Sequence, residues 1–120
     1  MRYLMFIKHA ENSHELAPPK PLMDAMETFV AEGFKSGWLK DTAGLKSTSE
    51  ALRIRSKGGK LSITDGPFAE AKEIIGGYAI VEAKSHDDAR EIARRFMELH
   101  RIHWPEFDCE SEVRPIEEMS

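Results

Sequence analysis

The chain has 120 residues, of which 41% are hydrophobic and 32% charged, and this balance is typical of one globular domain rather than a disordered chain. Its net charge of -4 argues against a nucleic-acid partner, which requires a concentrated basic face. No apolar run is long enough to span a bilayer, and the lone Cys109 permits no intrachain disulfide. We therefore expect one cytoplasmic domain over residues 1–120, without a membrane partner.

The first half of the chain predicts a strand, a helix, a strand and a hairpin. Residues 2–8 carry apolar side chains on both faces of an extended chain, as a central strand does. Pro21 suits the first turn of a helix that ends at Gly37, and a return strand follows over residues 38–46. The Gly58-Gly59 pair indicates a tight turn between strands over residues 51–57 and 60–64.

The second half predicts a strand, a helix and a strand. Residues 77–83 are again apolar on both faces, and Ser85 is a good N-cap for a helix that reaches about residue 99. A last strand covers residues 110–117. Right-handed crossovers place both helices on one side, so the order of elements predicts a ferredoxin-like α+β fold with an antiparallel sheet and two helices on one face.

Two helices cover only one face of this sheet, although the strands over residues 2–8 and 77–83 are apolar on both faces. The other face therefore needs a cover. A second copy of the same sheet, related by a two-fold axis, would provide it. The pattern thus predicts a homodimer, a dimeric α+β barrel.

Three segments carry a family resemblance: MRYLMFIKH at residues 1–9, TDGPFAEAKEIIGGYAIVEAKSHDDA at residues 64–89, and SEVRPIEE at residues 111–118. In this order the chain resembles the YCII-related proteins, in the branch called DGPF-domain proteins. The resemblance implies a ferredoxin-like fold, usually dimeric, with a cleft lined by the loop that contains the DGPF sequence. It implies either a small-molecule binder or cofactor-independent enzyme of the proton-transfer or elimination type, or a non-catalytic module beside an extracytoplasmic-type sigma factor.

One related subgroup includes an enzyme that removes chloride from a hydroxylated aromatic compound, with a His and an Asp acting together. Its catalytic His lies near the start of the first helix. The corresponding segment here, KPLMDAM at residues 20–26, has no histidine. This departure argues against a direct transfer of that activity.

His9 and Asp65 are the candidate catalytic residues. His9 ends the first strand in phase with Met5 and Ile7, where an imidazole could exchange protons near neutral pH, or could simply bond a loop carbonyl. Asp65 could act as a general base or orient a histidine, and it could equally serve the Asp-Gly-Pro turn by accepting a backbone N–H.

The remaining candidates would bind a small polar or anionic ligand. Glu70 and Lys72 could contact it or form a surface ion pair. Gly77, with Gly76, could let backbone N–H groups approach a ligand, or could mark a bulge or close strand packing. Tyr78 could present its hydroxyl to the cleft, or pack across strands. The ligand-binding set is Gly66, Phe68, Glu70, Lys72, Gly77, Tyr78 and Arg114.

Phe68 would be an apolar plug, directed into the core or across the dimer, and Arg114 would pair with Asp65 or Glu70 to hold the loop. His100, His103 and Cys109 could suggest a metal site, but no second spaced ligand pair supports it, and a histidine at a helix C-terminus is explained by the helix dipole. We therefore expect neither a metal nor an organic cofactor.

Overall fold

A computed structural model describes residues 1–10, 17–68 and 73–118 of the chain. Within them, two helices and six strands follow one another, with a short 3-10 turn, η2, between the second and third strands. The elements are β1 (Arg2–His9), α1 (Lys20–Ser36), β2 (Leu39–Gly44), η2 (Thr48–Glu50), β3 (Leu52–Lys57), β4 (Lys60–Asp65), β5 (Ile74–Glu82), α2 (His86–His103) and β6 (Cys109–Pro115).

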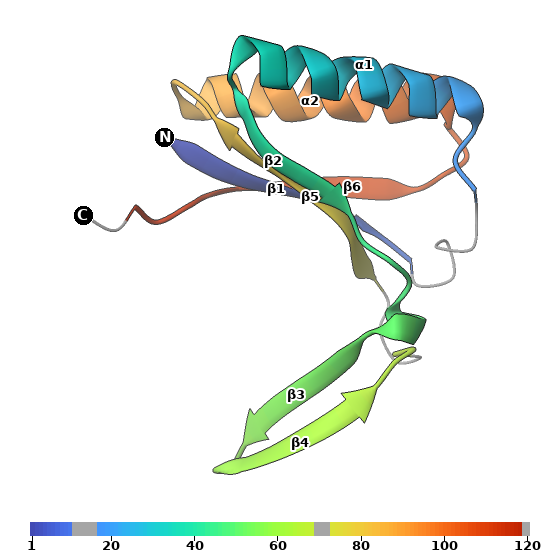
Figure 1. Cartoon of the computed structure of the whole chain (residues 1–120), viewed down its shortest axis with the longest axis vertical. Helices are drawn as coiled ribbons and strands as arrows, with labels where there is room; N and C mark the ends of the chain where they lie inside the picture. The colour runs from blue at the N-terminus through green and yellow to red at the C-terminus, as the bar shows by residue number, and fades with distance from the viewer. Residues whose placement is uncertain (11–16, 69–72, 119–120) are drawn as a thin grey trace.

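Four strands form one antiparallel sheet in the order β2-β5-β1-β6, and both helices lie on the same face of it (Figure 1). This arrangement confirms the predicted ferredoxin-like α+β fold. The two central strands are β1 and β5, the segments that the sequence marks as apolar on both faces. None of the helices described is long and apolar enough to cross a membrane.

Side chains alternate between the two faces of this sheet. Tyr3 lies opposite Val81 in the register of β1 and β5, and both are buried on the helix side in the core. The next pair, Leu4 and Ile80, therefore points to the face that no helix covers. These two side chains are half-buried by their neighbours on the sheet.

Strands β3 and β4 form a separate two-stranded sheet, which we call the arm (residues 52–65). The arm projects from the body of the molecule on the helix-free side of the four-stranded sheet (Figure 1). Its turn is the predicted glycine pair, since Gly58 and Gly59 have φ angles of 59° and 76°, which glycine adopts without strain. The radius of gyration is 16.1 Å, compared with about 14 Å for a compact domain of this length.

The helices begin and end as their sequences predict, with one exception. Ser85 caps α2, because its hydroxyl accepts the N–H of Asp88 at 3.1 Å. The C-cap of α1 is Gly37 in the left-handed conformation. However, α2 continues to His103 rather than residue 99, because the buried His100 extends its apolar stripe by one more turn.

Three strands also begin or end two or three residues from where the sequence predicts. β5 begins at Ile74, so Gly76 lies within the strand rather than before it, and Gly77 is not its first residue. β2 ends at Gly44, and β6 runs from Cys109 to Pro115. These shifts are small, but the first one places Gly76 and Gly77 inside the sheet, where they pack closely against neighbouring groups.

Candidate functional site

A cavity of about 510 Å³ lies between the helices and the helix-side face of the sheet. The central strands form its floor and the helices its roof. Most of its lining is apolar, and no Asp, Glu, Lys or Arg is among the described residues that line it. Its side chains with polar atoms include those of His9, Thr42, His100 and Ser111. The cavity therefore suits a small molecule that is largely apolar and carries few polar groups.

Aromatic rings gather at the end of this cavity where β1 and α2 terminate. Trp104 stacks on Phe107 with ring centroids 4.2 Å apart, and Phe107 lies 5.5 Å from the His9 ring. Phe96 meets His100 edge to face at 4.8 Å. Rings in these orientations attract one another through their quadrupoles, and they leave planar surfaces on which another ring can pack.

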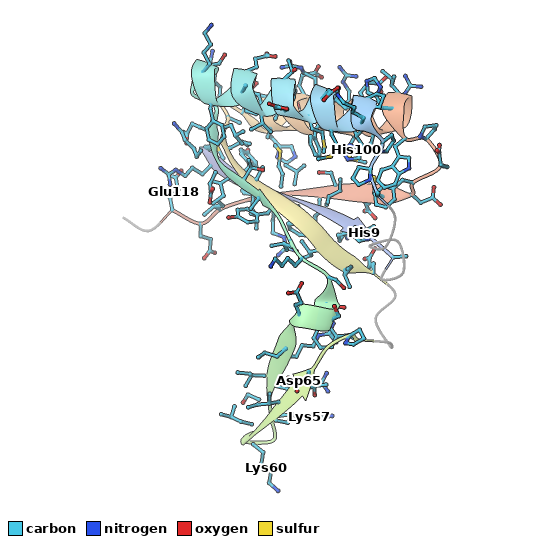
Figure 2. The ribbon with its side chains drawn as sticks, turned by 45° about the vertical axis from the view of Figure 1, so that its right-hand side comes forward. His9, Lys57, Lys60, Asp65, His100 and Glu118 are labelled. Atoms are coloured by element: carbon cyan, nitrogen blue, oxygen red, sulfur yellow. The ribbon has the colours of Figure 1, made fainter. Side chains whose placement is uncertain are left out.

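His9 is held at this aromatic end by the strand and by its own hydrogen bond. Its side chain is buried, and its Nδ1 donates to the carbonyl oxygen of Ala10 at 2.8 Å (Figure 2). The bond to a loop carbonyl, the structural alternative for this residue, is therefore present. Because a carbonyl can only accept, Nδ1 carries a proton, and the neutral form of the ring has its lone pair on Nε2.

The His9 ring lies over Gly76, which also lines the cavity. A Cβ atom at this glycine would come within 2.4 Å of His9 Nε2, a distance that no side chain could occupy without moving the ring. Gly76 therefore provides the space that the imidazole fills. Gly77 is packed differently, because a Cβ there would lie 3.1 Å from the carbonyl oxygen of Ala43 on β2. Both glycines thus allow close packing between neighbouring groups in the sheet.

His100 is the second imidazole of the cavity, and the sequence analysis did not assign it to the ligand-binding set. Its Nδ1 donates to the carbonyl of Phe96 at 3.1 Å, and burial lowers its pKa below the usual value of 6.5. The ring is therefore neutral at pH 7. Burial and the nearby Asp108 raise the pKa of Cys109, so its thiol stays protonated. Among the described residues, no group of three or more His, Cys, Asp or Glu is arranged to hold a metal ion.

Asp65 lies away from His9, in a different part of the molecule (Figure 2). It ends β4 on the exposed arm, opposite Leu52, whereas His9 lies in the body. Within one subunit the structure does not bring the two candidate catalytic residues together. Any shared role for them remains a prediction.

The residues after Asp65 build the base of the arm. The N–H of Gly66 donates to the carbonyl of Ala51 at 2.8 Å, and a Cβ on Gly66 would lie only 1.7 Å from the oxygen of Thr48. Phe68 is buried beneath the Arg53 guanidinium, which lies 3.7 Å from the ring centroid. Phe68 is thus an apolar plug at the arm's base, outside the cluster that forms the main core.

Two further predicted ligand-binding residues lie on the helix-free face of the sheet. Tyr78 donates its hydroxyl to Asp41 Oδ2 at 3.0 Å, and this bond raises the pKa of Tyr78. Arg114 donates to Glu112 Oε2 through Nε at 3.1 Å and Nη2 at 2.7 Å. Within the subunit Arg114 therefore pairs with Glu112, two residues away on the same strand face, and its suggested pairing with Asp65 or Glu70 stays a prediction. Glu70 and Lys72 lie outside the described residues.

Comparison with known proteins identifies the family. A family model, the YCII-related domain, matches residues 1–98. The chain belongs to the YCII-related family. A protein of Rhizobium meliloti (strain 1021), described as uncharacterized, is 37% identical over 60 residues. That match covers 50% of this chain and 48% of the relative, so the chain spans about half the length of this family relative.

Trp104, Phe107 and His100 belong to the cavity but were missed as ligand-lining residues by sequence reasoning. The available signal was the segment HRIHWPEF at residues 100–107, in which two histidines and two aromatic residues lie close together. The two histidines of this segment suggested a metal site or a favourable contact with the helix dipole, and neither reading indicated a ligand cavity. The structure instead folds it back over β1, where its rings meet His9.

Proposed function

We propose that this YCII-related protein binds a small, neutral aromatic molecule in its cavity, and that His9 accepts a proton from it without an organic cofactor. The observation that carries the proposal is the position of His9, whose Nδ1 donates to Ala10 within a cluster of aromatic rings. A ligand ring would pack among these rings, and its acidic group would point to the imidazole.

The proton transfer has a simple balance. The O–H bond of a ligand hydroxyl breaks, an N–H bond forms at His9 Nε2, and the ligand keeps the electron pair as an oxyanion. The resulting imidazolium is stabilised because the Ala10 carbonyl already accepts its other N–H. Such a transfer is also the first step that an elimination reaction requires.

A neutral ligand is favoured over an anionic one because the described lining of the cavity carries no Lys or Arg. His100 adds no positive charge, since burial lowers its pKa. A carboxylate would lose its hydration on entry without gaining a cationic partner there. The sequence-based expectation of an anionic ligand depended on Lys72, which lies outside the described residues. That ligand stays a prediction. The association with a sigma factor also stays a prediction.

We further propose that the protein is a homodimer. Support comes from the helix-free face of the sheet, where Leu4, Phe6 and Ile80 form an apolar centre on the two middle strands. A second copy that covers this face would remove the apolar centre from water.

The test uses p-nitrophenol, whose ionised form has its own absorbance band. At a pH below the pKa of free p-nitrophenol, where the free compound is neutral, we expect it to raise the melting temperature of the wild type and to show the phenolate band only when its proton passes to His9. Ser111→Trp should abolish binding because the indole fills the cavity from β6, whereas Ser36→Trp, at the exposed end of α1, should bind normally. His9→Gln should retain binding but lose the phenolate band. Equal binding by Ser111→Trp and the wild type would contradict the proposal.

A further inference from the structure

The arm has two chemically distinct faces. Residues that lie directly opposite each other in an antiparallel pair share a face, and the register joins Ile54 to Ile63 and Ser56 to Leu61. One face therefore carries Leu52, Ile54, Leu61 and Ile63. These four side chains are 57–75% exposed, although each is large and apolar.

The opposite face is basic. It carries Arg53, Arg55, Lys57 and Lys60, while Asp65 is the only acid in the arm. The arm therefore has a net charge of +3. Because the whole chain has a net charge of -4, the rest of it carries -7. The arm and the body thus attract each other electrostatically, whereas two arms repel.

The arm has too little cover to be stable as it stands. A two-stranded hairpin alone in water is marginally stable at best. Six of the ten large apolar side chains that are exposed in the described residues belong to the arm or to the adjoining ends of β2 and β5: Leu45, Leu52, Ile54, Leu61, Ile63 and Ile75. Large apolar side chains that are exposed together mark an interaction site in a soluble protein.

This surface adjoins the helix-free face of the four-stranded sheet. Lys8 lies opposite Ile75 in the register, and the arm projects on the same side of the sheet (Figure 1). That face has an apolar centre surrounded by carboxylates and by cations that pair with them, among them Lys8 and Arg114. Asp41 bonds the Tyr78 hydroxyl, and Glu73 and Glu112 both approach Lys8, at 3.5 and 3.3 Å.

We propose that the arm clasps the body of a second copy of this chain, with its apolar face against that copy. The inference rests on the proposed homodimer and adds the arm to its interface. A stable interface requires roughly 800 Å² from each partner, more than four side chains can bury, so the arm and the helix-free sheet face contribute together. The positive arm meets the negative body of the partner, which favours arm-to-body over arm-to-arm packing.

The principal test compares two double variants. Ile54→Asn with Ile63→Asn changes an opposed pair on the apolar face, and the control, Ser62→Asn with Thr64→Asn, changes the basic face. Light scattering after gel filtration should show a dimeric wild type and control. The apolar-face variant should dissociate at least tenfold more readily, with unchanged helical circular dichroism and p-nitrophenol binding.

The possible outcomes separate this inference from the proposals on which it rests. A wild type that is monomeric at micromolar concentration would overturn the dimer and the clasp together. A dimeric apolar-face variant with the dissociation constant of the wild type would overturn only the clasp. The effect of Ser111→Trp on p-nitrophenol binding tests the cavity proposal only and has no consequence for the arm.

Two further experiments examine other occupants of the apolar face. In a Cys109→Ser background, Ile54→Cys should not form a disulfide-linked dimer, because the two arms do not meet; efficient linkage would overturn arm-to-body packing. Vesicles containing phosphatidylglycerol should not bind the wild type. Binding that is lost in the apolar-face variant would assign the surface to a membrane instead.

Discussion

Large apolar side chains are buried in the body of this chain but exposed in the arm. In the body, Leu22 in the first turn of α1 is 1% exposed, whereas Leu61 in the arm is 75% exposed. The body has two layers that cover each other, and the arm has only one layer. The hydrophobic effect therefore stabilises the body within one subunit, whereas in the arm it can stabilise only an apolar face that a partner covers.

The largest effect should separate these two leucines. Leu22→Ala should lower the free energy of unfolding by about 2–5 kcal/mol, because it opens a cavity in a closed core. Leu61→Ala should change the stability of the isolated subunit by no more than about 0.5 kcal/mol. Urea titrations at several protein concentrations measure both values. If the arm is an interface, the loss caused by Leu61→Ala should increase with protein concentration and that caused by Leu22→Ala should not.

The contact between Gly76 and His9 should give the next largest effect. Gly76→Ala should cost about 1–3 kcal/mol of stability and weaken p-nitrophenol binding, because the new Cβ displaces the imidazole. Gly44→Ala is the matched control in the neighbouring strand β2, where a Cβ would meet no atom within 4 Å. Thermal unfolding and binding titrations compare the pair. If Gly76→Ala and Gly44→Ala had the same melting temperature and the same affinity for p-nitrophenol, the position of the His9 ring would not depend on the absence of a side chain at residue 76.

The buried His100 should make stability depend on pH. Its pKa is lowered in the folded protein, so the unfolded chain binds the proton first as the pH falls. The stability that it contributes is complete above pH 6.5 and is lost as the pH decreases toward the folded pKa. The free energy of unfolding should therefore decrease less steeply between about pH 7.5 and 5 in His100→Leu than in the wild type. An NMR titration that places the His100 pKa at or above 6.5 would contradict this expectation.

The smallest effect is expected for Arg114→Gln. Its partner Glu112 also accepts from Lys8 Nζ at 3.3 Å, and the Arg114 side chain is exposed, so the stability of the subunit should change by no more than about 0.5 kcal/mol. Denaturant titration at low protein concentration checks this value. A decrease of more than about 1 kcal/mol in the free energy of unfolding at low protein concentration would contradict this expectation, because an exposed ion pair such as Arg114–Glu112 contributes less than that.

The fold could be predicted from the sequence because its signals are local. Apolar side chains on both faces of residues 2–8 and 77–83 indicated the central strands, and Gly58-Gly59 and Ser85 indicated the turn and the helix start. The predicted end of the second helix, near residue 99, falls four residues short of its observed end at His103. In the structure, His100 satisfies its Nδ1 within the helix and lies in an apolar environment.

The candidate site was predicted only in part, because it depends on contacts between distant segments. His9 was recognised from its phase on the first strand. Part of the cavity roof and the aromatic end come from α2 and the segment after it, nearly a hundred residues later. The position of Asp65 on the arm, away from His9, follows from where the hairpin projects, and no local pattern specifies that direction.

The most direct test of the central claim, that a second copy covers the arm, is hydrogen exchange of the β3 and β4 amides measured at two protein concentrations. At tens of micromolar, we expect the amides of the arm to be protected nearly as well as those of β1 and β5. On dilution below the dissociation constant, arm protection should disappear while body protection remains. Arm amides that exchange rapidly at both concentrations, in a protein that is dimeric by light scattering, would contradict the account.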